Sequence, residues 1–212
     1  MQKQTIAIIS TLCVILLGVC GSATRLAAED IGSVPKDTQL AILRHPGTPP
    51  TGGKDADVIL VEYFDYNCPF CKKLAPALQG LLESDAKVAL IYKDWPILSD
   101  VSAYAAGLAL AANWQGKYLV AHDTLMAAPR LASNEQVDSL LQKAGLDVAL
   151  LKKDHEAHSA AITNLLQRND REIRALGVRG TPGLLIGRHI INGVYDVAGL
   201  QQAVAIARHE GT

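Results

Sequence analysis

Two apolar runs, separated by an amphipathic segment, form the most regular pattern in the chain. Residues 58–64 (VILVEYF) and 87–93 are apolar along almost their whole length, which is typical of strands covered on both faces. Between them, residues 69–84 place one apolar face at helical spacing: Cys71, Leu74, Ala75, Leu78 and Leu82. Two strands joined by a crossover helix predict a βαβ unit with parallel pairing.

Residues 96–176 follow a different pattern, in which one predicted helix succeeds another. One of these helices opens with a capping box, because Ser133 is followed three positions later by Gln136 and then by apolar residues at helical spacing. We interpret this segment as an all-helical insertion.

Strand patterns return near the C-terminus. Residues 183–186 and 188–192 are short and apolar, and Gly187 at the first turn position between them suits a type II′ hairpin. An amphipathic helix follows Asp196. The whole order predicts an α/β protein with a thioredoxin-like core (βαβ…ββα) at residues 56–95 and 177–212, interrupted by the insertion at 96–176.

The N-terminal region divides into two segments. Residues 1–23 combine Lys3, an apolar stretch too short to span a bilayer, and the small residues Gly21 and Ala23, so we predict a signal peptide cleaved near Thr24. An uncleaved anchor is the alternative, whereas lipidation at Cys20 is disfavoured. Residues 24–55 are polar and rich in Pro and Gly, and we interpret them as an irregular lead-in segment.

Composition narrows the classes of function. The formal net charge of −1 becomes −2 once Lys3 is removed with the signal peptide, and no basic cluster is present, so nothing favours nucleic acid or an anionic membrane surface as partner. The remaining chain of about 190 residues is long enough for one sizeable core. Export to an oxidising compartment also allows a disulfide to persist.

Two of the four cysteines survive cleavage, Cys68 and Cys71 in the stretch FDYNCPFCKK. Structural zinc needs four ligands, and covalent haem needs a histidine where Lys72 stands. Cu(I) would have only Met126 as a thioether ligand in the mature chain. A purely structural disulfide would close a loop of two residues, which stabilises a fold little. A redox-active dithiol is therefore favoured, and no cofactor or metal is expected.

The position of the pair assigns a role to each sulfur. Cys68 lies where the predicted helix begins, so unpaired backbone N–H groups and the helix dipole favour its thiolate. We predict that Cys68 is the attacking sulfur and that Cys71, one turn further on, resolves mixed disulfides. Pro69 at the first helical position removes no needed hydrogen bond. A lowered pKa of Cys68 favours the reduced fold, so the pair is predicted to be a net oxidant.

Together, FDYNCPFCKK, Glu62 and GVRGTPGLLIG at 177–187 resemble the DsbA-type periplasmic thiol:disulfide oxidoreductases. The resemblance implies that Pro182 is cis and packs beside the cysteines, and that Thr181 offers backbone groups to a bound peptide. It also implies that Glu62, a carboxyl group in an apolar strand, relays a proton for Cys71, with Lys93 as charge partner.

The resemblance further implies a periplasmic enzyme that acts on reduced or misfolded exported polypeptides and is recharged by a DsbB-like membrane oxidase. Two departures matter: Phe70 stands where a histidine is best known, and residues 24–55 are too short for the dimerisation domain of the isomerases DsbC and DsbG. A monomeric oxidase is therefore expected. An isomerase or reductase of the DsbC/DsbG type, or a Cu(I)-binding or chaperone-like module, remains the alternative.

Four further polar residues receive no chemical role at this stage. Asp65 and Tyr66 are expected at the rim of the site. His155 and His158, three positions apart on a predicted helix, could bind a metal, but we interpret them as solvated side chains.

Overall fold

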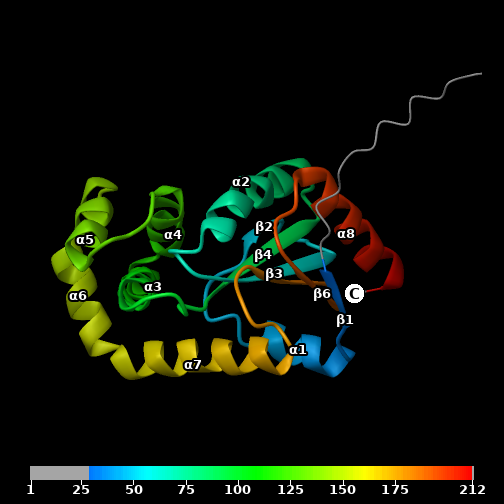
Figure 1. Cartoon of the computed structure of the whole chain (residues 1–212), viewed down its shortest axis with the longest axis horizontal. Coiled ribbons are helices and arrows are strands. Elements are labelled where there is room, and N and C mark those ends of the chain that lie inside the picture. The colour runs from blue at the N-terminus through cyan, green and yellow to red at the C-terminus, as the bar shows by residue number, and fades with distance from the viewer. Residues whose placement is uncertain (1–28, 212) are drawn as a thin grey trace, which may run out of the picture.

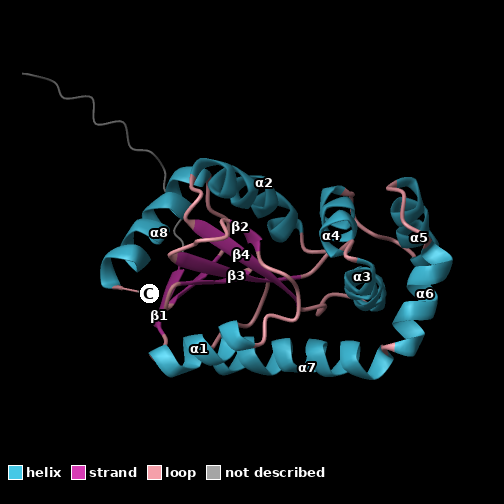
Figure 2. Cartoon of the chain, turned by 180° about the vertical axis from the view of Figure 1, so that it is seen from behind, coloured by secondary structure: helices cyan, strands magenta, loops and turns pink. Residues whose placement is uncertain are grey.

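A six-stranded sheet lies at the centre of the computed structural model, which describes residues 29–211 (Figure 1). The strand order is β1-β6-β5-β3-β4-β2. Helices α2 and α8 cover one face of the sheet and α1 and α7 the other, while the remaining helices form a block beside it (Figures 1 and 2). The predicted fold class, a thioredoxin-like core with a helical insertion, is confirmed. The predicted signal peptide at 1–23 lies outside the described residues.

The core follows the predicted elements closely. Strand β3 (Val58–Phe64) pairs in parallel with β4 (Val88–Asp94), and helix α2 (Pro69–Ser84) connects them. The hairpin of β5 (Gly183–Ile186) and β6 (His189–Asn192) joins β3 in antiparallel orientation. Gly187 has a φ of 56° and Arg188 does not share this positive φ, which agrees with a type II′ turn. Helix α8 (Val197–Glu210) completes the core, with Asp196 accepting a hydrogen bond at its N-terminus.

Residues 29–52 differ from the irregular lead-in that the sequence predicts. They form β1 (Glu29–Ser33), helix α1 (Lys36–Arg44) and the two-residue strand β2 (Thr51–Gly52). Strand β1 pairs with β6 and β2 with β4, so both lie at the edges of the sheet. Short edge strands depend on a partner that is distant in sequence, so local patterning does not reveal them.

The helical block lies between β4 and β5 in the chain, as predicted. It contains α3 (Asp100–Ala112), the 3₁₀ turn η1 (Asn113–Gln115), α4 (Tyr118–Ala127), α5 (Asn134–Lys143), α6 (Val148–Ala157) and α7 (Ser159–Ala175). The predicted capping box opens α5: the Gln136 N–H donates to Ser133 Oγ at 3.3 Å, and Gln136 Oε1 accepts from the Ala132 N–H at 2.7 Å. Among residues 29–211, no helix is both long and apolar enough to cross a bilayer.

Two hydrophobic clusters lie on opposite faces of the sheet. The larger one joins the α2 and α8 face to the helical block and includes both cysteines. The smaller one lies on the face covered by α1 and α7 and includes Val61, Tyr63 and Trp95. Because side chains alternate along a strand, Glu62 and Phe64 of β3 face the larger cluster, together with the cysteine pair.

Candidate active site

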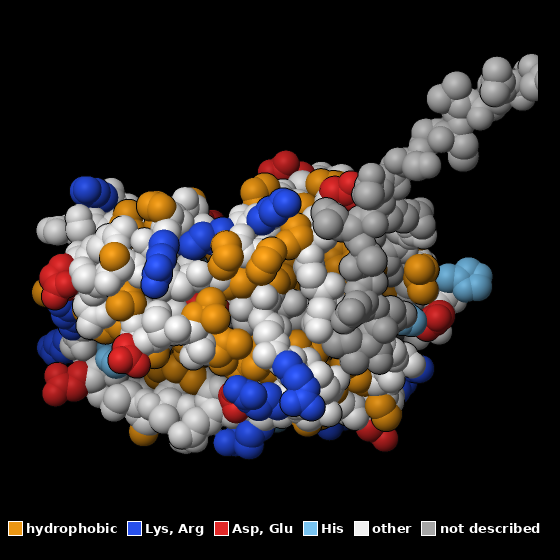
Figure 3. Space-filling view, viewed as in Figure 1, with side chains coloured by type: hydrophobic (Ala, Val, Ile, Leu, Met, Phe, Trp, Pro, Cys, Tyr) orange, Lys and Arg blue, Asp and Glu red, His pale blue; other side chains and the backbone are white. Residues whose placement is uncertain are grey.

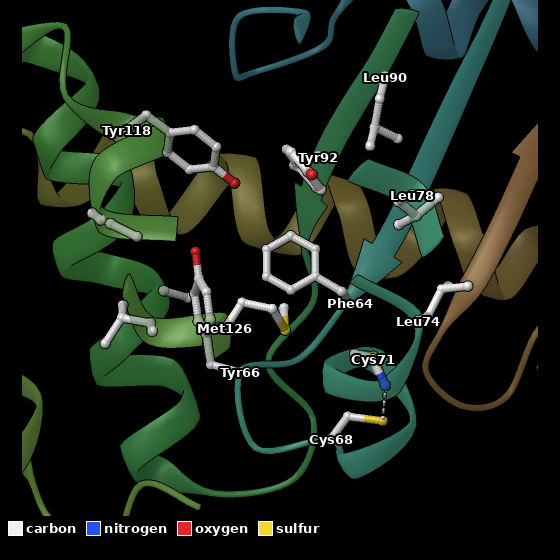
Figure 4. Packing of buried hydrophobic residues seen from close by; sticks show 14 of the residues in the cluster. Phe64, Tyr66, Cys68, Cys71, Leu74, Leu78, Leu90, Tyr92, Tyr118 and Met126 are labelled. Atoms are coloured by element: carbon white, nitrogen blue, oxygen red, sulfur yellow. Dashed lines mark hydrogen bonds between the residues drawn. The ribbon is translucent and has the colours of Figure 1, made fainter. Parts of the chain in front are cut away.

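Cys68 occupies the N-cap of helix α2 (Figure 4). Its Sγ accepts a hydrogen bond from the Cys71 backbone N–H at 3.4 Å, and Pro69 follows at the first helical position. A hydrogen bond from the Cys71 side chain is the largest of the causes that lower the pKa of Cys68 to about 6, and the backbone N–H groups of Phe70 and Cys71 add to it. The Cys71 thiol, and after it the N–H groups of the helix start that the sequence predicts, therefore favour a thiolate at Cys68.

Cys71 has the opposite character, although both cysteines are free thiols in the structure. It is completely buried, and this burial, followed by the hydrogen bond to Cys68, raises the pKa of its thiol far above the ordinary value. Two sulfurs one helical turn apart thus differ sharply in acidity. Such a pair has one good leaving group, Cys68, and one sulfur that takes up a proton on release.

The loop before β5 closes over the cysteines from the other side. The Thr181-Pro182 peptide bond is cis, as expected, and the Cys68 thiol donates a hydrogen bond to the Thr181 carbonyl oxygen at 3.2 Å. Pro182 is buried and Thr181 is half-buried. Gly183 lies so close to its neighbours that an added Cβ would approach Val178 Cγ1 to 2.9 Å. This tight packing fixes the loop beside the Cys68 sulfur.

Glu62 is buried in β3, with 1% of its surface exposed. Burial raises the pKa of Glu62 to about 8, and the negative charge of a Cys68 thiolate adds to the effect. Its Oε1 has no hydrogen-bond partner among the described residues. The expectation of a buried carboxyl group is therefore confirmed, and this group is protonated over much of the neutral pH range.

The expected pairing of Glu62 with Lys93 is wrong. In the parallel register, Glu62 lies opposite Tyr92, whereas Lys93 lies opposite Tyr63 and so faces the other side of the sheet. There the Lys93 ammonium contacts the Glu172 carboxylate and donates to the Ile42 carbonyl at 3.2 Å. Lys93 thus connects β4 to α7 and α1, on the face of the sheet opposite the cysteines.

Asp65 and Tyr66 are buried rather than at the rim, which corrects a second expectation. Each is 1% exposed. The Asp65 carboxylate accepts hydrogen bonds from the backbone N–H groups of Asn67, Ile97 and Leu98, at 2.7, 2.7 and 2.9 Å. It thereby joins the loop that carries Cys68 to the loop after β4. A short carboxylate just after a strand can satisfy several loop N–H groups, which is the signal that the sequence offered.

A buried polar cluster behind the cysteines was not predicted. The Tyr66 hydroxyl lies 3.3 Å from His122 Nδ1, and the Tyr118 hydroxyl donates to Asp94 Oδ2 at 2.7 Å. Burial lowers the pKa of His122 to about 3 and raises that of Asp94 to about 7, so His122 remains neutral. This polar cluster lies among aromatic rings, those of Tyr66, Tyr118, Phe64 and Tyr92 (Figure 4).

His155 and His158 lie outside the site. His158 stacks on the Trp114 ring, with centroids 4.1 Å apart, and His155 packs against Gly107 of α3. Both are half-buried packing residues rather than fully solvated ones.

The surface beside Cys68 is apolar. Phe70 is 59% exposed and Leu98, which lies beside the Asp65 loop, is 51% exposed. Figure 3 shows hydrophobic side chains gathered across the middle of this face, between the helical block and the sheet. An extended polypeptide with apolar side chains is the kind of molecule that such a surface suits.

Comparisons with known proteins agree with this arrangement. The model of the family described as thioredoxin matches residues 44–205. A thioredoxin-like oxidoreductase from Silicibacter pomeroyi is similar, with 35% identity over 83% of this chain and 99% of that chain and a TM-score of 0.76. A periplasmic thioredoxin-like protein from Salmonella enterica (27% identity, 84% and 99% covered, TM-score 0.70) is also similar. The thiol-disulfide exchange protein α-DsbA2 of Wolbachia pipientis is similar too, with 26% identity over 80% of this chain and 95% of that chain and a TM-score of 0.71.

One similar protein is much longer than this chain. The Na⁺/H⁺ antiporter NhaA 3 of Salinispora tropica is 31% identical over 74% of this chain, but the match covers only 24% of the antiporter. The chain therefore spans about a quarter of the length of that relative.

Proposed function

We propose that this chain, which belongs to the thioredoxin family, is a thiol-disulfide oxidoreductase that donates the disulfide of Cys68 and Cys71 to exported polypeptides. The observation that carries the proposal is the contrast in acidity within the pair. Cys68, at the helix start, has a pKa of about 6, and Cys71 behind it is fully buried with a strongly raised pKa. The similarity to proteins described as oxidoreductases and as a thiol-disulfide exchange protein supports it.

In the proposed reaction, a substrate thiolate attacks Cys68 Sγ of the oxidised pair. A mixed disulfide forms, the Cys68–Cys71 bond breaks, and Cys71 leaves and takes up a proton. A second substrate thiolate then attacks the substrate sulfur of the mixed disulfide, and Cys68 departs as a thiolate. The substrate gains a disulfide and loses two electrons, which the cysteine pair receives. A sulfur of low pKa leaves fast, which is why Cys68 suits this second step.

Glu62 is the proposed source of the proton for Cys71. It lies on the same side of the sheet, and its raised pKa of about 8 means that it holds a proton near neutral pH. Its charge also raises the pKa of Cys71, so the two groups are electrostatically coupled. We expect the protonated carboxyl group to neutralise the departing Cys71 thiolate, and to recover its proton through water afterwards.

Thr181 and Pro182 are proposed to hold the substrate. The Thr181 carbonyl already accepts a hydrogen bond from the Cys68 thiol, so its backbone reaches the reacting sulfur. An extended peptide whose cysteine approaches Cys68 can therefore bond to this backbone, in the manner of an added strand. The exposed Phe70 and Leu98 extend the contact with apolar side chains.

Oxidation is favoured over isomerisation within this proposal. Residues 29–52 belong to the sheet layer, with β1 and β2 at its edges and α1 on one face, which argues against a separate dimerisation domain there. We propose a monomer that works in the periplasm, as does the Salmonella thioredoxin-like protein, and is recharged by a DsbB-like membrane oxidase. We also propose a signal peptide at 1–23, an N-terminal segment to residue 55 that adds β1, α1 and β2 to the core, the core itself at 56–95 and 177–212, and an insertion at 96–176.

A trapping experiment tests the proposed roles. The oxidised protein is mixed with a reduced peptide that carries two cysteines, and disulfide formation is followed by mass spectrometry. The reduced Cys71→Ser and Cys68→Ser variants are mixed separately with a single-cysteine peptide that is dimerised through a disulfide. Cys71→Ser should accumulate a mixed disulfide, because Cys68 attacks the dimer and releases one peptide thiolate, and no Cys71 remains to resolve the adduct. Cys68→Ser should form no adduct. Adducts on Cys68→Ser but not on Cys71→Ser would reverse the roles. Fast rearrangement of a scrambled substrate, with slow net oxidation, would favour the isomerase alternative.

A further inference from the structure

We propose that Lys72 is the cationic partner of the cysteine pair, holding a fixed positive charge beside the two sulfurs and so favouring the Cys68 thiolate. This inference rests on the proposed dithiol function. Lys72 is a positioning residue here: it neither reacts nor transfers a proton, and acts through the charge that it presents to Cys68.

The ammonium group of Lys72 is fixed in place by the last turn of α4. Its Nζ donates to the Leu125 carbonyl at 2.7 Å and to the Met126 carbonyl at 3.3 Å. The side chain is half-buried, so it lies against α4 instead of extending into solvent. These bonds also connect α2, which carries the cysteines, to the helical insertion. Figure 4 shows Met126 close to the first turn of α2.

The charged and titratable groups around Lys72 come from three elements. Lys72 lies one helical turn after Cys68, the N-cap of α2, and its backbone N–H donates to the Cys68 carbonyl at 3.1 Å. Cys71 precedes it on α2, Asp65 lies on the loop after β3, and His122 lies on α4. His122 is neutral, and the Asp65 carboxylate already accepts three backbone hydrogen bonds. Burial lowers the pKa of Lys72 to about 8, while Cys71, Asp65 and Cys68 oppose this, so the ammonium stays charged at pH 7. Lys72 is thus the cation of this group.

The helix end that Lys72 contacts explains why a charge is needed. The C-terminal carbonyls of a helix carry partial negative charge, and those of α4 lie next to the first turn of α2. Without a cation, this negative end would oppose a thiolate on Cys68. Pro69 and Phe70, the two exposed residues between the cysteines, carry no charge. Lys72 therefore supplies the positive charge that the motif itself lacks.

Variants of the reduced protein that remove or keep the positive charge of residue 72 test the inference. The pKa of Cys68 is measured by thiolate absorbance. Lys72→Met removes the charge and keeps the length of the chain, whereas Lys72→Arg keeps the charge; Lys73→Met changes the exposed neighbour as a matched control. We expect the pKa of Cys68 to rise by about 0.5 to 1 unit in Lys72→Met, which is roughly three- to tenfold less thiolate at pH 5. Lys72→Arg and Lys73→Met should match the wild type.

A measurement on the unaltered protein covers the case in which Lys72→Met does not fold. Because coupling between two sites is reciprocal, a thiolate must raise the pKa of Lys72 as much as Lys72 lowers that of Cys68. NMR titration should therefore give a higher Lys72 pKa in the reduced protein than in the oxidised one. Equal values in the two states would overturn the inference, as would equal shifts in Lys72→Met and Lys72→Arg.

These readouts are independent of substrate. A failure to oxidise the test peptide would count against the proposed function, whereas unchanged titrations would count against the role of Lys72 alone.

Discussion

Glu62 shows how burial alone can give one residue a chemical property. Its carboxyl group is 1% exposed, and burial raises its pKa from 4.5 to about 8. The neutral form is therefore the stable one in the fold. Its contribution to stability is fully present below pH 4.5 and is lost as the pH rises towards 8.

This property predicts the behaviour of Glu62→Gln, whose side chain cannot ionise. Relative to the wild type, the variant should gain stability between pH 4 and pH 7 by an amount of order 3 kcal/mol. Guanidinium unfolding of the reduced proteins at both values measures it. The exposed Glu83→Gln on α2 is the control and should give the same difference at both pH values. A pH-independent effect of Glu62→Gln would show that Glu62 ionises as freely as a surface residue.

At the scale of elements, one ion pair attaches two helices to the sheet. Lys93 of β4 is fully buried and contacts Glu172 of α7 and the Ile42 carbonyl of α1, while the side chain of Glu172 remains 17% exposed. Arg168 also lies 3.6 Å from the Glu172 carboxylate. The two partners are therefore unequal: Glu172 retains water and a second cation without Lys93, whereas no second carboxylate within residues 29–211 forms an ion pair with Lys93.

We therefore expect Glu172→Gln to destabilise the protein by about 3 kcal/mol, because it leaves a buried ammonium group without its counter-charge. Lys93→Met should cost only about 1 kcal/mol, since an apolar side chain of similar length fills the space. Chemical denaturation of both variants measures the difference. Lys152→Gln, which removes a mostly exposed pair with Asp138, should leave the stability nearly unchanged. Equal losses at Lys93 and Glu172 would contradict this account.

At the scale of the whole molecule, the acidity of Cys68 connects the redox state to folding. Its pKa is lowered from 9.0 to about 6 in the reduced fold. A lowered pKa contributes stability that is fully present above the unfolded pKa and is lost as the pH falls through the folded pKa. At pH 7 the reduced fold gains at most about 1.4 kcal/mol, which corresponds to about 30 mV towards a more oxidising pair.

The stability of the reduced protein, relative to the oxidised one, should therefore increase by about 1.4 kcal/mol between pH 5 and pH 7. Guanidinium unfolding of both redox forms at the two pH values measures this. Direct titration of Cys68 near pH 6 provides the cross-check. A relative stability that does not change with pH would mean that Cys68 titrates as an ordinary thiol, and would favour the structural or reductase alternatives.

Local sequence determined those parts of the protein whose causes lie within one element. The apolar run of β3, the helical spacing of α2 and the glycine of the β5–β6 turn each fixed an element without help from distant residues. The same holds for Cys68, because a cysteine directly before a helix meets unpaired N–H groups wherever that helix packs. The resemblance carried by GVRGTPGLLIG supplied the cis bond before Pro182.

Tertiary structure decided everything that depends on register and on distant partners. The side chains of Lys93 and Glu62 lie on opposite faces because of how β3 and β4 align, and a shift of one residue would have reversed this. Strands β1 and β2 exist only because β6 and β4 offer them edges. The contacts of Lys72 with α4 and of Tyr66 with His122 likewise join segments more than 50 residues apart. Such contacts form when hydrophobic burial brings whole elements together, so no local pattern in the chain contains them.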